Sequence, residues 1–228
     1  MTAVNAQGSS DEDRRARITL LASCLAMLTL GVNGTAIMAA LPTIRLELAL
    51  TAGELEWAIN AYLVVSAACI IPAGRLSDQL GARNIAMVGL AIFAIAAAVV
   101  ATAQIPAALL TGRALQGLAA ALGVPATLAA INEATASQRR ASAIGAWAGF
   151  LMLGFSLGPL VGGVLTHYAD WRIIFCGSGA VMLVATGGLL VADGAIAFAI
   201  GGLPAVMGLI AAIALTGAWL AGNLKSGQ

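Results

Sequence analysis

Seven long stretches of the sequence carry no charged side chain, or a single one, and short charged or glycine-containing segments separate them. The stretches are residues 18–44, 57–74, 84–112, 114–132, 141–171, 173–192 and 194–224. A helix needs about 20 apolar residues to cross the hydrocarbon core of a bilayer. Lipid offers backbone groups no hydrogen bonds, so each crossing segment must be helical. The pattern predicts an all-α polytopic membrane protein with spans near 18–41, 57–74, 85–103, 107–131, 142–166, 172–191 and 195–220.

The composition agrees with lipid as the main solvent, because 61% of the residues are hydrophobic, 9% are charged and the mean hydropathy is +0.97. A net charge of +1 without a basic stripe excludes a nucleic-acid surface. The three cysteines lie at no metal-ligand spacing and His167 is the single histidine, so we expect no metal site and no cofactor. Without paired carboxylates or a nucleotide-binding motif, the sequence does not indicate an enzyme.

The basic residues predict the orientation, because cytoplasmic loops are enriched in Lys and Arg. With the N-terminus inside, seven face the cytoplasm and three face outward: Arg14, Arg15, Arg17, Arg75, Arg83, Arg139 and Arg140 against Arg45, Arg172 and Lys225. Trp57 and Trp171 would then lie at the outer interface. The expected division is a mobile cytoplasmic tail at 1–17, a six-helix bundle at 18–191, and a seventh helix with a short tail at 192–228, in the inner (plasma) membrane.

The segment Gly74-Arg75-Leu76-Ser77-Asp78-Gln79-Leu80-Gly81-Ala82-Arg83 lies between the second and third predicted spans. Two glycines allow a tight cytoplasmic turn, and the simplest interpretation is an ordinary charged loop. The spacing, however, resembles the G-x-L-x-D-x-x-G-x-R signature that transporters of the major facilitator superfamily carry in this loop. The resemblance implies that Gly74, Asp78, Gly81 and Arg83 form a gating loop, with Asp78 and Arg83 as its clasp.

Arg113 lies inside the fourth predicted span, where a guanidinium is costly and by default marks a polar cavity or a proton pathway. The alternative is an arginine whose side chain reaches back to the outer interface. The R-x-x-Q-G pattern of Arg113, Gln116 and Gly117 is similar to the family's fourth-helix motif, whose arginine is implicated in proton coupling. Asn60, Tyr62 and Asn132 add polar groups for which contacts between helices are the simpler role.

Gly154, Gly158 and Gly162 recur every four residues in the fifth predicted span, next to Pro159 and Gly163. Such spacing lets helices approach closely, and generic packing would explain it. The G-P-x-x-G-G ending resembles the antiporter motif of drug exporters, and Asp170-Trp171-Arg172 with Ile174-Phe175 resembles the fourteen-helix drug:proton antiporter branch. In that family this glycine face meets the second half of the transporter.

The first span ends on Asn33-Gly34-Thr35-Ala36-Ile37-Met38-Ala39-Ala40-Leu41-Pro42, which resembles D-x-T-I-V-N-V-A-L-P of the same branch. Asn33 stands where that pattern has an acidic residue. A carboxylate can take up and release a proton, whereas an amide cannot. Asn33 can still hydrogen-bond a substrate or line a cavity.

The resemblance implies the N-terminal half of a transporter, with six helices in two inverted three-helix repeats and substrate handled near the bilayer midplane. The implied function is proton-coupled efflux of drugs or small lipophilic metabolites by a half-length form. Alternating access needs a second bundle, so the implied partner is a missing C-terminal half or a second copy docked on the Gly154–Gly162 face. The alternative is a transport-incompetent fragment or a membrane interaction protein.

Overall fold

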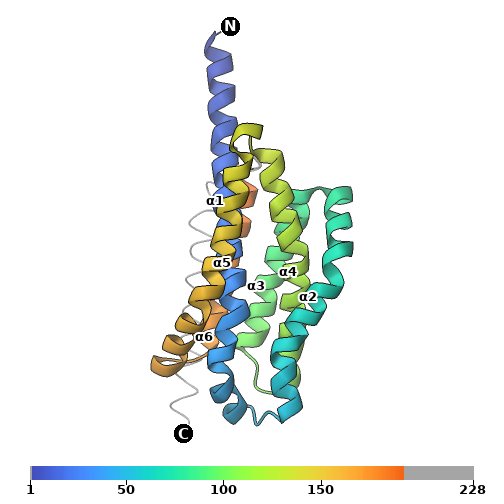
Figure 1. Cartoon of the computed structure of the whole chain (residues 1–228), viewed down its shortest axis with the longest axis vertical. Helices are drawn as coiled ribbons and strands as arrows, with labels where there is room; N and C mark the ends of the chain where they lie inside the picture. Colours follow the sequence, from blue (N-terminus) through green and yellow to red (C-terminus); the bar gives the residue numbers. More distant parts are fainter. Residues whose placement is uncertain (1, 193–228) are drawn as a thin grey trace.

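The computed structural model describes the backbone of residues 2–192 and the side chains of residues 11–192. Six helices make up this part of the chain: α1 Thr2–Glu47, α2 Ala52–Leu80, α3 Ala82–Ala101, α4 Pro106–Ala134, α5 Ser137–Tyr168 and α6 Arg172–Ala192. Between residues 2 and 192 there is no β-strand. The helices run up and down along one long axis, and α1 extends beyond the others at its N-terminal end (Figure 1). The all-α prediction is confirmed.

The packing of the helices divides the bundle into two equivalent halves. α1 packs against α5 and α6, while α4 packs against α2 and α3. The halves meet where α1 touches α4 and α3 touches α6. Exchanging α1 for α4, α2 for α5 and α3 for α6 leaves this pattern of contacts unchanged. Such symmetry is expected where α1–α3 and α4–α6 are two three-helix repeats. α2 and α5 are the least buried helices and flank the bundle.

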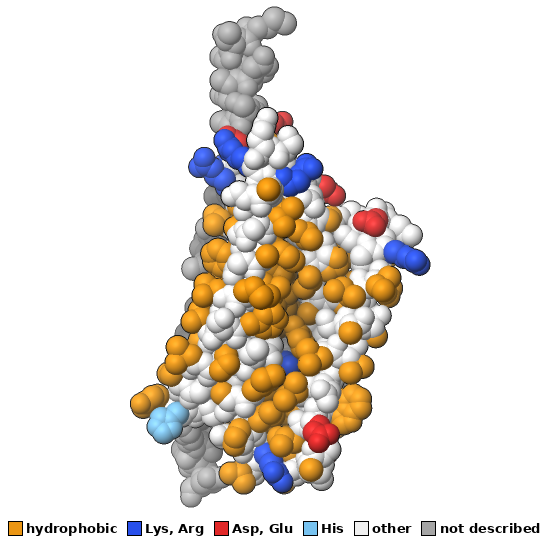
Figure 2. Space-filling view, viewed as in Figure 1, with side chains coloured by type: hydrophobic (Ala, Val, Ile, Leu, Met, Phe, Trp, Pro, Cys, Tyr) orange, Lys and Arg blue, Asp and Glu red, His pale blue; other side chains and the backbone are white. Residues whose placement is uncertain are grey.

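All six helices are long and apolar enough to cross a membrane. On the face shown in Figure 2, the charged side chains gather mainly at the two ends, and many apolar side chains lie between them. An apolar surface of this kind is stable only against lipid or another apolar surface. The described part of the chain is therefore a multi-pass membrane bundle.

The helices extend beyond the predicted spans at several ends. α1 begins at Thr2 instead of residue 18, so the segment expected to be a mobile tail is helical. α2 begins at Ala52 because Thr51 caps it: the Thr51 side chain accepts from Glu54 N at 3.3 Å and Glu54 Oε2 accepts from Thr51 N at 2.9 Å. Hydropathy detects only the part of a helix in hydrocarbon, and these ends lie beyond it. The seventh predicted span, 195–220, lies outside the described residues.

The predicted turn of two glycines between α2 and α3 is wrong in its extent. α2 continues to Leu80, so Gly74 and Asp78 are helical, and Gly81 alone makes the turn. Gly81 has φ +91°, a conformation that residues with a side chain rarely adopt. Gly74 has no neighbour within 4 Å of where a Cβ would be, so nothing there requires a glycine.

The glycine face of α5 is buried against α1 of the same chain. A Cβ at Gly154 or Gly162 would overlap the carbonyl oxygen of Leu28 or Ala36, and Gly31 brings α1 equally close from its side. Pro159 lies within α5, and the Cβ position of Gly163 is 4.0 Å from Ala39 Cβ. The expectation that the Gly154–Gly162 face is free for a second copy or a second half is therefore wrong, because α1 already covers it.

Candidate functional site

Arg113 lies at the centre of a polar cluster enclosed by the bundle. α4 begins at Pro106, whose missing N–H suits the first helical position, and Arg113 follows two turns later. Its side chain is 0% exposed. An arginine reaching the outer interface would expose its guanidinium, so that alternative is wrong. The whole positive charge is held within protein.

Three hydrogen bonds orient the guanidinium, and each acceptor comes from a different helix. Nε donates to the Ala58 carbonyl oxygen of α2 at 3.0 Å. Nη1 donates to Asn33 Oδ1 of α1 at 3.0 Å and to Gln116 Oε1 of α4 at 2.9 Å. The structure thus brings together the three predicted residues Asn33, Arg113 and Gln116.

Tyr62 closes the cluster on the side of α2. Its ring centroid lies 4.7 Å from Arg113 Cζ, within the range of a cation–π contact. Ala58 and Tyr62 are one turn apart, so the same face of α2 supplies the carbonyl and the ring. Gly117 makes this approach possible, since a Cβ there would overlap the Tyr62 carbonyl oxygen. The glycine of the R-x-x-Q-G pattern therefore brings α2 onto α4.

Asn33 connects the cluster to α6 through Ser178, a residue that the sequence analysis missed. Asn33 Nδ2 donates to Ser178 Oγ at 2.9 Å, and Ser178 Oγ donates to the Ile174 carbonyl at 2.6 Å. Both side chains are buried. Serines are common in apolar helices, so the sequence gives no sign that Ser178 contacts the cluster. It does so because α6 is rotated in the bundle such that Ser178 faces Asn33.

The cluster has more donors than acceptors and no negative charge. Within residues 11–192, no Asp or Glu forms an ion pair with Arg113. Arg113 Nη2 and Gln116 Nε2 are buried and have no hydrogen-bond partner. The described residues also contain no group of three His, Cys, Asp or Glu side chains that could hold a metal ion.

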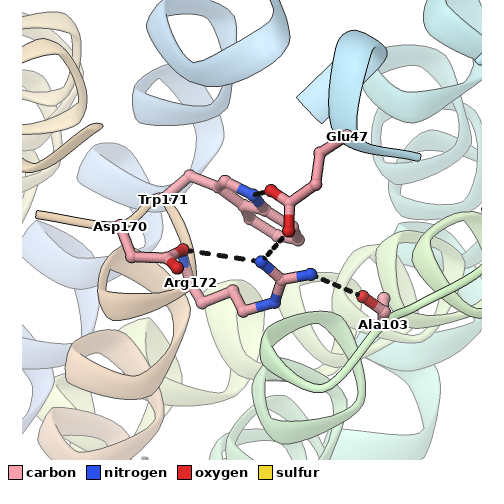
Figure 3. A network of polar contacts seen from close by, with 5 residues as sticks. All are labelled: Glu47, Ala103, Asp170, Trp171 and Arg172. Carbon is pink, nitrogen blue, oxygen red and sulfur yellow. Dashed lines mark hydrogen bonds and ion pairs between the residues drawn. The ribbon is translucent and has the colours of Figure 1, made fainter. Parts of the chain in front are cut away.

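A second polar network lies where α1 ends, α3 ends and α6 begins, and Figure 3 shows its five residues. Arg172 pairs with Glu47 and Asp170, and its Nη2 donates to the Ala103 carbonyl at 3.1 Å. Trp171 Nε1 donates to Glu47 Oε2 at 2.7 Å. Trp171 is 1% exposed, so its side chain packs within the protein and does not face lipid. Its position at the level of the outer interface stays a prediction. The network joins the two halves of the bundle at this end.

The residues of the predicted gating loop lie at the opposite end. Asp78 is exposed on α2, whereas Arg83 Nη2 donates to Thr19 Oγ1 of α1 at 2.7 Å. The loop is thus attached to α1 through Arg83. Whether Asp78 and Arg83 act as a clasp stays a prediction.

A pocket of about 730 Å³ opens near the same end, between α1 and the ends of α3, α4 and α5. Arg139 and Asp13 pair across it at 3.3 Å, with both side chains more than half exposed. Side chains of both signs line it, namely Glu12, Asp13, Arg15, Arg83, Glu133 and Arg139. An open pocket with mixed charge favours no ligand class, so the Arg113 cluster is the candidate site.

Comparison with known proteins identifies relatives of the bundle. The family described as Major Facilitator Superfamily matches residues 20–193. The chain is 32% identical over 171 residues to a methyl viologen resistance protein, SmvA, of Salmonella typhimurium. The aligned segment covers 75% of the chain and 34% of that protein. It is 36% identical over 162 residues to the multidrug efflux pump LfrA of Mycolicibacterium smegmatis, covering 71% and 32%. A tetracenomycin C resistance and export protein of Streptomyces glaucescens is 32% identical, covering 69% and 29%. The match takes in about a third of the length of these relatives.

Proposed function

Because the chain belongs to the Major Facilitator Superfamily, we propose that its six-helix bundle is the N-terminal half of a plasma-membrane exporter of drug-like molecules. The observation that carries this proposal is the buried Arg113 cluster, set between the two halves of a bundle whose relatives are named for resistance and export. A charge enclosed in a membrane bundle is retained at a cost, and its usual use is in a substrate or ion pathway. The fourteen-helix antiporter branch is the proposed placement within the superfamily.

The exporter works with a second six-helix bundle, either covalently continuous with this one or separate from it. α2 and α5 are the least buried helices and carry exposed apolar side chains that such a bundle would cover. These include Trp57, Leu63, Val64 and Ile71 of α2 and Phe150, Met152, Leu160 and Val164 of α5. Movement of the two bundles against each other would expose a central site to each side of the membrane in turn.

The residues of the cluster take separate roles in this proposal. Arg113 supplies the fixed charge that responds to substrate or proton movement, while Asn33 and Gln116 hold the guanidinium in place. Asn33 cannot carry a proton. Proton coupling, where it occurs, therefore runs through Arg113 and groups outside this cluster.

Dye efflux from a drug-sensitive bacterial host tests the proposal. The chain is expressed alone, where a second copy can act as the other bundle, and with the C-terminal half of LfrA. We expect efflux of a fluorescent lipophilic dye in at least one setting, loss of efflux with an uncoupler, and loss with Arg113→Ala. Arg139→Ala is the control, because Arg139 is exposed and lies outside the cluster.

Inserted protein without efflux in either setting contradicts the exporter proposal. That result favours the second candidate, a membrane interaction protein whose exposed α2 and α5 bind other membrane helices. Efflux that survives Arg113→Ala with unchanged pH dependence keeps the exporter and removes the role of Arg113.

A further inference from the structure

The Arg113 guanidinium carries a positive charge that nothing in the described bundle neutralises. Its hydrogen-bond acceptors are two amide oxygens and a backbone carbonyl, and its stacking partner is a phenol ring. No Asp or Glu within residues 11–192 forms an ion pair with Arg113, and Glu56, which is two residues from Ala58 on α2, is exposed. Arginine does not lose its proton in proteins. An isolated buried charge is strongly unfavourable, so a counter-charge is expected close by.

The unused donors show where such a counter-charge would bind. Arg113 Nη2 and Gln116 Nε2 are both buried without a partner, and each nitrogen carries two N–H bonds. Gln116 Oε1 already accepts from Arg113 Nη1, so Nε2 on the same amide lies beside the guanidinium. Buried donors without acceptors are rare in folded proteins. Two adjacent unused donors next to an uncompensated cation form the complement of an anion.

We propose that Arg113 and Gln116 form an anion site, which binds either a small inorganic anion such as chloride or the carboxylate of an exported compound. An anion supplies both the missing acceptors and the missing charge, whereas a water molecule supplies only the acceptors. Asn33 keeps the site open, because a carboxylate at 3.0 Å from Arg113 Nη1 would neutralise the guanidinium from within the protein. The carboxylate version of the inference rests on the proposed exporter function, and the chloride version does not.

The covering groups of the site belong mainly to α2. Ala58 and Tyr62 shield the guanidinium, and α2 packs chiefly on α4 with little contact to α1. Movement of α2 away from α1 therefore opens the site, and return of α2 encloses the anion beneath Tyr62.

Thermal unfolding of the purified 228-residue chain in detergent tests the site. Methanesulfonate at constant ionic strength is replaced in one arm by chloride and in a second by benzoate, a lipophilic carboxylate. We expect a saturable rise of roughly 5 °C in the unfolding midpoint in at least one arm, as for ligand at about 100 times its Kd. A response to chloride alone identifies a resident inorganic anion, and a response to benzoate alone identifies a substrate carboxylate.

Two carboxylate substitutions and a matched control locate the response. Asn33→Asp supplies an internal counter-charge and should abolish the rise, and Gln116→Glu should do the same if the first variant does not fold. Asn84→Asp makes the same chemical change at an exposed residue of α3 and should keep the rise.

An unfolding midpoint of the unmodified chain that responds to neither anion overturns the proposal. A response that persists in a folded Asn33→Asp or Gln116→Glu variant also overturns it, because the anion then binds elsewhere. The measurement involves no transport, so its failure leaves the exporter proposal standing. A chain without dye efflux, in turn, leaves the chloride version of the anion site standing.

Discussion

Arg113 is surrounded by groups that accept hydrogen bonds without carrying charge, and these groups come from three helices. Two of its partners are held in turn by other residues: Gly117 allows Tyr62 to approach α4, and Ser178 accepts a hydrogen bond from Asn33. A side chain with several fixed partners has one orientation, which is what a site that must discriminate between ligands needs. Loss of any partner leaves a buried polar atom unsatisfied.

Ser178 gives the simplest test of this arrangement. Ser178→Ala removes the acceptor of Asn33 Nδ2 and leaves a buried donor without a partner. We expect the free energy of unfolding to fall by about 1 kcal/mol, the range of buried hydrogen bonds within membranes. The measurement is denaturant titration of the purified chain in mixed micelles.

Ser156→Ala is the control for this experiment. The Ser156 hydroxyl is exposed and donates only to the Met152 carbonyl of its own helix. Its loss should change stability by less than about 0.5 kcal/mol. Equal effects of the two substitutions would contradict a structural role for the Asn33–Ser178 contact.

The sequence predicted the members of this cluster that are rare in a membrane span and missed those that are common there. Arg113, Asn33 and Gln116 are unusual in apolar segments, and the structure brings them together. Ser178 has no such signal, because several Ser and Thr residues in the spans bond only to their own helix, as Thr29 does with Leu25. Which hydroxyl faces the cluster depends on helix rotation, a property of the assembled bundle.

At the scale of elements, hydropathy located the centres of six helices and missed their ends. α2 runs from Ala52 to Leu80, past Glu54 at one end and Asp78 at the other. Charged residues there lie where the helix leaves the hydrocarbon, so a charge-free window stops too early. The residue at which α2 begins is determined by local capping, here the capping box that Thr51 and Glu54 form.

The helix that packs against the α5 glycine face could not be predicted from the sequence either. Spacing every four residues indicates a close contact between helices and says nothing about which helix provides it. The structure places α1 there, with Gly31 opposite Leu151 and Phe155. Helix order in space, which decides this, depends on long-range packing.

Gly162→Ala tests the closeness of the α1–α5 contact. The added Cβ would overlap the Ala36 carbonyl oxygen, and backbone cannot move aside as a flexible side chain can. We expect a loss of about 1–3 kcal/mol in the free energy of unfolding, the range for overpacking a well-packed interior.

Gly149→Ala makes the same change more than three turns earlier in α5, where nothing lies within 4 Å of the new Cβ. Alanine favours helix over glycine, so this variant should gain up to about 1 kcal/mol. The two variants should therefore differ in sign. A Gly162→Ala chain as stable as the unmodified one would show that α1 and α5 are farther apart than described.

At the scale of the whole molecule, the charged side chains on the face shown in Figure 2 gather mainly at its two ends. Arg113 lies within the bundle and is enclosed by protein. The two ends differ in their fixed connections. Arg172 and Glu47 tie α1 to α6 at one end, whereas Arg83 and Thr19 tie α3 to α1 at the other. Polar contacts therefore connect α1 to another helix at each end of the bundle. α2 and α5 take no part in these contacts and are the least buried helices. Any large motion that opens the Arg113 cluster is therefore expected in α2 before α1.

The excess of arginine at the end that carries the α4–α5 turn predicts that this end is cytoplasmic. Ala52, the first residue of α2, and Ala136, directly before α5, are exposed at opposite ends and provide matched positions for labelling. In a background where Cys24, Cys69 and Cys176 are replaced by Ala, we expect Ala52→Cys to react with a membrane-impermeant maleimide in intact cells. Ala136→Cys should react only after permeabilisation. The reverse pattern would show that the bundle inserts with its N-terminus outside, and the positive-inside argument would then fail for this chain. Reaction of both in intact cells would mean that both orientations are present, which a net excess of four basic residues at one end should prevent: seven arginines predicted inside against two arginines and Lys225 predicted outside.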